Sequence, residues 1–175
     1  GKSDPASEVL AGSDFPRWFL NSFLVAGITT LSVLVFDPLL GYAFCKYRFR
    51  GKEAIFTILL STMMIPTEMM IIPWYMMVNQ LGWNNTYWSM LFPGLSSAFG
   101  IFLMRQFFTG VPDELLDAGR IDGLSEFGVY TRIGLPLVTP ALSALGIFTF
   151  LGNWNSFLWP VIALDSKEKY TITLG

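Results

Sequence analysis

The chain has 175 residues, enough for one domain, but a composition of 53% hydrophobic and only 14% charged residues argues against a water-soluble one. Its mean hydropathy of +0.51 points the same way. The net charge of −2 provides no basic field for nucleic acid, and the lack of His together with a single Cys excludes an internal disulfide, a thiolate metal cluster and the commonest acid–base catalyst.

Four apolar segments follow a polar N-terminal stretch. Residues 1–17 have no apolar core after a basic start, so they do not form a signal peptide, and we interpret them as an extracytoplasmic segment from the interior of a longer protein. Each apolar segment supplies the roughly 20 residues that cross a hydrocarbon core, and buried helices of soluble proteins rarely run this long without a polar face. The last segment is long enough to include a kink at Pro136 or Pro140. The predicted membrane spans are 18–44, 54–78, 86–108 and 133–164.

The loops between the spans predict their orientation. The 45–53 loop contains four basic residues, and short basic loops stay in the cytoplasm. Alternation then places the 109–132 loop inside, and the 79–85 loop, residues 1–17 and residues 165–175 outside. Aromatic residues of the kind that form an interfacial belt gather at the predicted outer boundaries: Trp18, Trp83, Tyr87, Trp88 and Trp159.

The 109–132 loop has the punctuation of two short helices. Pro112 suits a first helical position, and acidic residues follow it in the first turn, where they complement the helix dipole. Gly123 can take the left-handed conformation that ends a helix, and Ser125 can cap a second helix with Glu126 in its first turn. A loop of this length in a compact bundle usually has a function.

The same loop carries a motif with fixed spacing. The letters DAG at 117–119 are followed by Gly123, then by nine residues, and then by IGLP at 133–136. This pattern resembles the EAA loop, Glu-Ala-Ala-x3-Gly-x9-Ile-x-Leu-Pro, which marks the permease subunits of binding-protein-dependent ABC importers. Asp117 keeps the charge of the Glu, whereas Gly119 in place of the second Ala is expected to weaken the helix by up to about 1 kcal/mol.

The resemblance covers most of the chain. The stretches YRFRGK, IIPWYMMVNQLGWNNTYWSMLFPGL and FLGNWNSFLWPVIAL resemble the carbohydrate branch of that family, and in particular the second permease subunit of the maltose importer. The resemblance implies an all-α integral membrane protein with the type I ABC importer permease core over residues 18–164. About four of an expected six transmembrane helices would be present, together with a cytoplasmic coupling helix.

The resemblance also implies a role for the motif. In that family the EAA loop forms a coupling helix that docks into a groove on the ATP-hydrolysing subunit. Its apolar residues would seat the helix in the groove, and its charged residues would fix the register. The apolar residues are Leu115, Leu116, Ala118 and Ile121, the charged ones are Asp117, Arg120 and Asp122, and the candidate set is completed by Glu114, Gly119, Gly123, Ile133, Leu135 and Pro136.

Candidates for substrate contact lie inside the spans. Glu68 is an intramembrane carboxylate, which marks either a functional site or a group satisfied by a neighbouring helix. Asn153, Trp154 and Asn155 suit a sugar, because an indole face packs on C–H surfaces while amides bond hydroxyls. Asn can equally join membrane helices to each other, so both interpretations of this cluster stay open.

Three other residues have structural interpretations. We expect Asp37 to pair with a basic group or to reach a wet interface, and Arg105 to extend its guanidinium towards the cytoplasm. Cys45 is expected to be a small buried apolar side chain.

The implied function is that of a permease subunit in an ATP-driven importer, which forms the path of a sugar or oligosaccharide by alternating access in a bacterial-type cell membrane. The expected partners are a nucleotide-binding ATPase subunit with its ATP and Mg, a second homologous permease subunit, an extracytoplasmic solute-binding protein, the sugar and the lipid bilayer, with no nucleic acid. This chain has no phosphate-binding loop, so we expect it to be no enzyme and to hold neither a metal nor a cofactor. Two alternatives stay open: an ABC permease for glycerol phosphate, an amino acid or a peptide, and a secondary carrier in which Glu68 and Asp37 would bind the driving ion.

Overall fold

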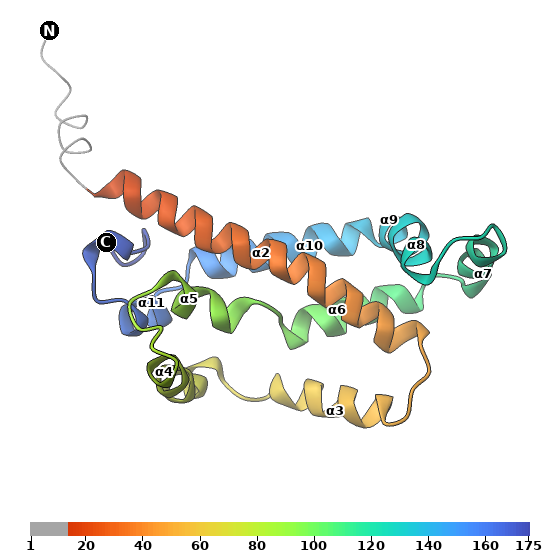
Figure 1. Ribbon diagram of the computed structural model, residues 1–175, viewed down its shortest axis with the longest axis horizontal. Helices are drawn as coiled ribbons and strands as arrows, with labels where there is room; N and C mark the ends of the chain where they lie inside the picture. Colours follow the sequence, from red (N-terminus) through yellow and green to blue (C-terminus); the bar gives the residue numbers. More distant parts are fainter. Residues whose placement is uncertain (1–13) are drawn as a thin grey trace, which may run out of the picture. The chain divides into compact units, whose positions relative to one another are not determined.

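The computed structural model describes residues 14–175, and all regular structure in this range is helical, which confirms the all-α class. The chain forms two compact units, each built from separate stretches of sequence. Two long helices, α2 (Phe15–Lys46) and α10 (Thr139–Trp154), contribute residues to both units (Figure 1). Unit 1 holds the described residues up to Thr30 with 67–95 and 149–175, and unit 2 holds 31–66 and 96–148.

Unit 1 consists of short helices packed around Trp159. This side chain is buried, lies edge-to-face on Trp74 with ring centroids 5.6 Å apart, and donates its indole N–H to the Ser89 carbonyl at 2.8 Å. The expectation that Trp159 belongs to an interfacial belt is therefore wrong, because its polar edge is satisfied inside the unit. Besides parts of α2 and α10, the elements are η1 (Thr67–Met70), α4 (Ile71–Gln80), α5 (Tyr87–Leu91), η2 (Phe92–Gly94), α11 (Leu158–Ala163) and η4 (Lys167–Lys169).

The C-terminal segment closes unit 1 against the beginning of α2. The side-chain amide of Asn21 donates to the carbonyl oxygens of Glu168 at 2.9 Å and Tyr170 at 3.0 Å. The hydroxyl of Ser22 accepts a hydrogen bond from the Ile172 N–H at 2.8 Å. Both side chains are buried on an apolar helix, and these backbone partners satisfy them.

Unit 2 packs α6 (Ala98–Thr109) closely against the second half of α2. Gly41 makes this possible, because a Cβ at that position would lie 2.7 Å from the Met104 Cβ and 2.8 Å from the Arg105 backbone nitrogen. The core beside this contact includes Tyr42, whose ring lies 5.1 Å from that of Phe108. The other elements are α3 (Lys52–Thr62), which packs on α6, and then α7 (Asp113–Ile121), α8 (Glu126–Val129), the π-helical turn η3 (Tyr130–Gly134) and α9 (Leu135–Leu137).

The number of membrane spans depends on how broken helices are counted. Among the described residues, two helical stretches, Phe15–Lys46 and Tyr87–Thr109, are long and apolar enough to cross a membrane, and the number rises to four if each of two interrupted helix pairs is one span. The second predicted span is interrupted after Thr62. The fourth bends by 79° at Val138, between Pro136 and Pro140, so the expected kink is present. A further interruption between Trp154 and Leu158 was not expected.

The two charged residues of unit 2 spans have partners that the sequence did not indicate. Asp37 is fully buried and accepts hydrogen bonds from the Ser96 hydroxyl at 2.6 Å, the Ser97 hydroxyl at 2.9 Å and the Ser97 N–H at 3.1 Å. No basic group among residues 14–175 pairs with it, so the expected cation or wet interface is wrong. Arg105 has its guanidinium 3.2 Å from the Glu53 carboxylate and 3.9 Å above the Phe56 ring.

Candidate coupling site and solute path

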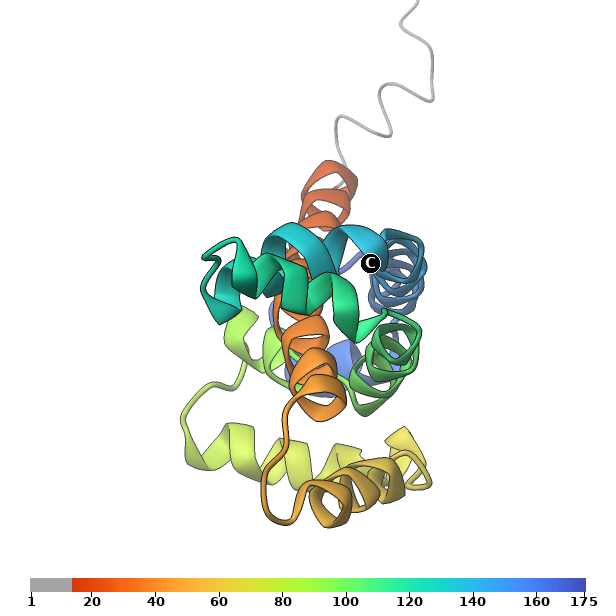
Figure 2. The same ribbon diagram turned by 90° about the vertical axis from the view of Figure 1, so that its right-hand side faces the viewer.

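The motif segment forms the predicted pair of short helices in unit 2. Figures 1 and 2 show α7 joined to α8 by a tight turn. Gly123 has a φ of 86°, as expected, and its N–H donates to the Arg120 carbonyl while the Leu124 N–H donates to the Gly119 carbonyl. This is a Schellman ending, which satisfies the last carbonyls of α7. Pro112 precedes the helix by one position, one residue earlier than predicted.

The predicted cap of α8 is present. The Ser125 hydroxyl accepts a hydrogen bond from the Gly128 N–H at 3.2 Å, and Glu126 occupies the first turn. This bond satisfies one of the N–H groups that a helix start leaves without a partner. The direction in which the chain leaves the turn is therefore fixed at both sides, by Gly123 and by Ser125.

Arg120 joins the two helices electrostatically. Its Nη1 lies 2.6 Å from the Asp117 carboxylate, and its Nε and Nη2 donate to the two carboxylate oxygens of Glu126 at 2.8 and 3.1 Å. The forked contact with Glu126 matches the geometry that suits a guanidinium. These bonds hold the pKa of Glu126 below its usual value and raise the pKa of Arg120.

The basic loop after α2 fastens this segment to the end of the helix. Lys46 donates to the Val111 carbonyl and to the Asp113 carboxylate, both at 2.7 Å, and this pairing lowers the pKa of Asp113. The Tyr47 hydroxyl donates to Glu126 at 3.2 Å. The sequence indicated the loop only as a topology signal. Its role as a tether was missed, because the partners lie more than 60 positions away.

Gly119 allows the π-helical turn η3, which contains Ile133 of the motif, to pack against α7. A Cβ at this position would lie 2.3 Å from the Ile133 Cδ1 and 3.5 Å from the Val129 side chain. Gly in place of the Ala of the consensus therefore leaves room for a close contact between two parts of the motif. It also lowers the helix propensity of α7. Leu135 and Pro136 lie in α9, just before the bend at Val138.

The apolar residues of α7 divide into buried and exposed ones. Leu116 is only 1% exposed and packs in the core of unit 2, so its expected role in seating the helix on a partner is wrong. Leu115 is 45% exposed and Ile121 is 86% exposed. With the exposed Ala118 they are spaced three residues apart along one side of the helix, and we call these three residues the apolar stripe. Phe127 on α8, which the sequence did not single out, is 67% exposed.

The candidate solute residues all fall in unit 1 but do not form one cluster. Glu68 is exposed in η1. The amides of Asn153, in α10, and of Asn155, directly after it, each donate to a carbonyl of α10 at 2.9 Å, so in the described residues neither amide nitrogen joins two helices. Trp154 makes the contact between helices instead, with its ring 5.3 Å from that of Phe19 on α2.

One of these candidates, Asn153, lines a cavity of about 180 Å³ in unit 1. The polar residues Asn153 and Ser156 line the cavity together with the indoles of Trp74 and Trp159. Polar groups beside aromatic walls are the surface that a sugar ring requires. The lining contains no charged side chain, and its remaining residues are Val25, Thr67, Met90, Pro93 and Gly94.

Apolar helices long enough to cross a membrane define the chain as part of a helical membrane protein. The chain belongs to the family "Binding-protein-dependent transport system inner membrane component", which it matches over residues 38–173. It is therefore a multi-pass inner-membrane protein.

Three relatives show which members of this family the chain resembles. The chain is 39% identical to the arabinooligosaccharides transport system permease protein AraQ of Bacillus subtilis, over 94% of this chain and 58% of that protein. It is 36% identical to the lactose transport system permease protein LacG of Rhizobium radiobacter, over 98% and 63%. It is 33% identical to the sn-glycerol-3-phosphate transport system permease protein UgpE of Agrobacterium fabrum, over 96% and 60%.

The fold matches a solved transporter. A chain in the crystal structure of a bacterial ABC transporter involved in the import of the acidic polysaccharide alginate superimposes with a TM-score of 0.85 and 27% identity, over 96% of this chain and 59% of that one. The protein thus spans about three fifths of the length of the relatives it matches.

Proposed function

We propose that the protein is the permease subunit of an ATP-driven importer and carries a sugar or oligosaccharide by alternating access. The observation that carries the proposal is the folded motif segment with its exposed apolar stripe, found in a chain whose relatives include permeases named for arabino-oligosaccharides and lactose. ATP and Mg would bind a partner ATPase, and a second permease subunit and an extracytoplasmic binding protein would complete the importer.

The coupling mechanism follows from what α7 contacts. The apolar stripe would lie in a groove of the ATPase subunit, with Asp117 and Asp122 near its rim. Movement of the ATPase would then reach α2 through Lys46 and would reach α9 and α10 through the contact between Gly119 and Ile133. Leu116 would position α7 from inside, without touching the partner.

The contacts between loops support the proposed topology. The 45–53 loop contacts the 109–132 loop through Lys46 and Asp113, as two loops on the cytoplasmic side can. Asn85 donates to the Ser166 hydroxyl at 2.6 Å, so the 79–85 loop contacts the 165–175 segment, as two loops on the outer side can. Neither of these two contacts joins loops that the predicted topology assigns to opposite sides of the membrane. The part of residues 1–17 that precedes Asp14 lies outside the described residues.

The cavity in unit 1 favours a neutral sugar over the runner-up, glycerol phosphate, which the similarity to UgpE keeps in view. Phosphate recognition uses Arg, Lys or convergent backbone N–H groups. The cavity is lined by no Lys or Arg. Asn153 and Ser156 would bond the hydroxyls of the passing sugar, with Glu68, Trp154 and Asn155 as further candidates along the path.

The test is uptake by the assembled importer in proteoliposomes, containing the full-length permease, its partner permease, the ATPase and the binding protein. We expect uptake of labelled arabinotriose or lactose that requires ATP on the ATPase side and that a protonophore leaves unchanged. Ile121→Asp should lower uptake at least about tenfold, because it places a charge in the apolar contact. The matched control is Leu81→Asp, which changes an exposed Leu of the 79–85 loop and should retain uptake.

The outcomes separate the alternatives. Uptake that follows a proton gradient without ATP would identify a secondary carrier. Uptake of glycerol phosphate in place of both sugars would favour the runner-up, with the coupling proposal intact. Equal activity of the Ile121 and Leu81 variants would reject the apolar stripe as the coupling surface.

A further inference from the structure

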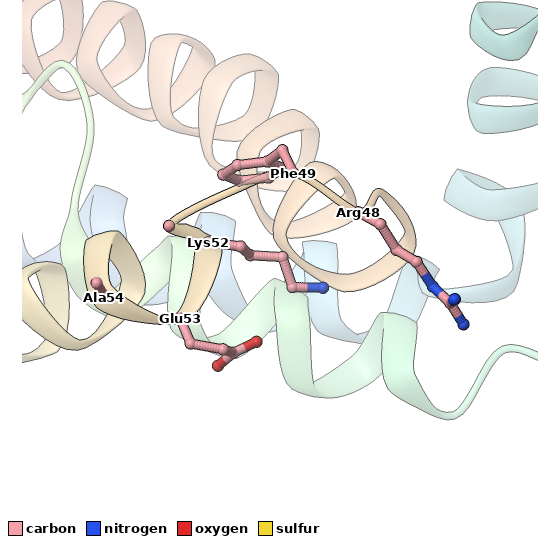
Figure 3. Close-up of a pocket in the computed structure, with 6 residues that line it drawn as sticks. Arg48, Phe49, Lys52, Glu53 and Ala54 are labelled. Atoms are coloured by element: carbon pink, nitrogen blue, oxygen red, sulfur yellow. The ribbon is translucent and has the colours of Figure 1, made fainter.

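A second hollow, of about 320 Å³, opens on the loop that joins α2 to α3 in unit 2 (Figure 3). Arg48 and Lys52 extend from the loop into the same region, while the Phe49 ring lies on the other side of the chain. Gly51, Glu53 and Ala54 complete the lining. We propose that this hollow binds the phosphate group of an anionic membrane lipid.

The charges around the hollow leave it positive. The Glu53 carboxylate is paired with Arg105, at 3.2 Å. Within residues 14–175, Arg48 makes no hydrogen bond or ion pair, and Lys52 donates only to two backbone carbonyls, at 3.1 and 3.5 Å. Two of the three charged side chains that line the hollow are therefore cations, and Arg105 pairs with the third, the Glu53 carboxylate. Both are side chains of the kind that bind phosphate best, a guanidinium and an ammonium.

The loop is shaped before any ligand arrives. Gly51 has a φ of 80°, which a residue with a side chain rarely adopts, and it turns the chain directly into α3. Lys52 holds the loop through the carbonyls of Cys45 and Tyr47, and the Phe49 ring lies 5.8 Å from that of Phe44. Binding would therefore order little additional chain, which lowers its entropic cost.

The surroundings favour a lipid over a soluble anion or a protein partner. The loop lies between two apolar helices, and α3 exposes Ile55 at 50% and Ile58 at 67% within two turns of the hollow. Exposed apolar residues beside a basic loop are typical of the boundary where acyl chains meet headgroups. A lipid can satisfy both features at once, with its phosphate in the hollow and its acyl chain along α3. This site shares no lining residue with the cavity in unit 1 and does not depend on which solute is carried.

The test measures lipid binding to the full-length permease by native mass spectrometry in detergent. Phosphatidylglycerol and phosphatidylcholine with identical acyl chains are titrated separately. We expect the wild type to prefer phosphatidylglycerol and Arg48→Gln/Lys52→Gln to bind it roughly 25-fold more weakly, because each cation near an anionic headgroup contributes roughly fivefold. Arg48→Gln alone changes an exposed side chain without partners, so it keeps the fold and should lose roughly fivefold.

The controls decide what is bound. Arg17→Gln/Lys167→Gln removes two cations from unit 1 and should leave the affinity unchanged, while Arg48→Lys should retain most of it. Inorganic phosphate at millimolar concentration should not displace the lipid; displacement would show that the hollow takes the phosphate group from soluble sources and would overturn the lipid assignment. Equal phosphatidylglycerol affinity in the wild type and the Arg48/Lys52 double variant would reject the site.

Discussion

Asp37 illustrates how a single side chain organises a break between helices. Its carboxylate accepts hydrogen bonds from three donor groups of Ser96 and Ser97, and the Ser97 hydroxyl also accepts from the Gly100 N–H at the start of α6. Gly100 is required beside it, because a Cβ there would lie 2.0 Å from the Asp37 Oδ2. The sequence marks Asp37 as unusual, but its partners lie about 60 positions away and no local rule identifies them.

Gly41 gives a prediction at the same scale. In Gly41→Ala the new methyl group meets the Arg105 backbone nitrogen as well as Met104, so a rotamer change cannot relieve the overlap. We expect a loss of about 1–3 kcal/mol in unfolding free energy. The measurement is thermal unfolding of the full-length permease in detergent. Gly27→Ala is the matched control on the same helix, where a Cβ would meet open space, and it should leave the transition unchanged or slightly higher. Equal transitions for both variants would contradict the close packing of α2 and α6.

The elements show which parts of the fold a sequence can predict. The turn at Gly123 and the cap at Ser125 depend on residues within a few positions, so local rules predicted both. The burial of Leu116 was not predicted, because α7 has apolar residues on two sides and only the packing of unit 2 decides which side faces inward. The Lys46 tether and the interruption at Trp154 likewise depend on contacts distant in sequence.

The order of the motif segment should depend on pH and on the ion pairs of Arg120 with Asp117 and Glu126. Arg120→Gln removes the links to Asp117 and Glu126, each worth up to about 1 kcal/mol at an exposed site, so α7 and α8 should become more mobile at pH 7. Pairing with Arg120 lowers the pKa of Glu126, and pairing with Lys46 lowers that of Asp113, so the stabilisation from both carboxylates is complete above the pKa of a free carboxyl and is lost as the pH falls through the lowered values. Wild-type order should therefore hold from pH 7 to about 5 and decline below about 4.

A nitroxide label at Asp122→Cys, in a permease with Cys45→Ser and no other exposed cysteine, reports this mobility by electron paramagnetic resonance. Asp122 is exposed and makes no side-chain bond among the described residues. The Arg120→Lys variant keeps the charge but not the fork, and should fall between the wild type and Arg120→Gln. A spectrum unaffected by Arg120→Gln would show that the cluster does not order the segment.

At the scale of the whole molecule, the features that the proposed topology places in the cytoplasm belong to unit 2, and those that it places outside belong to unit 1. The 45–53 loop, the motif segment and the basic hollow are all in unit 2, whereas the cavity beside Asn153 and the 165–175 segment are in unit 1. Helices α2 and α10 run continuously from one unit into the other. The proposed importer would need such a connection, because the partner ATPase would hydrolyse ATP on one side of the membrane while the solute enters from the other. Composition predicted the membrane class, but only the folded chain separates the two sets of residues.

The most direct measurement places a photo-crosslinking benzoylphenylalanine at position 121 of the full-length permease in native membranes. The account predicts a product that joins the permease to an ATPase subunit with a phosphate-binding loop, identified by mass spectrometry, and no such product from the same group at position 81. A crosslink from position 81 but not from position 121, or none to any ATPase from either, would contradict the proposed coupling surface.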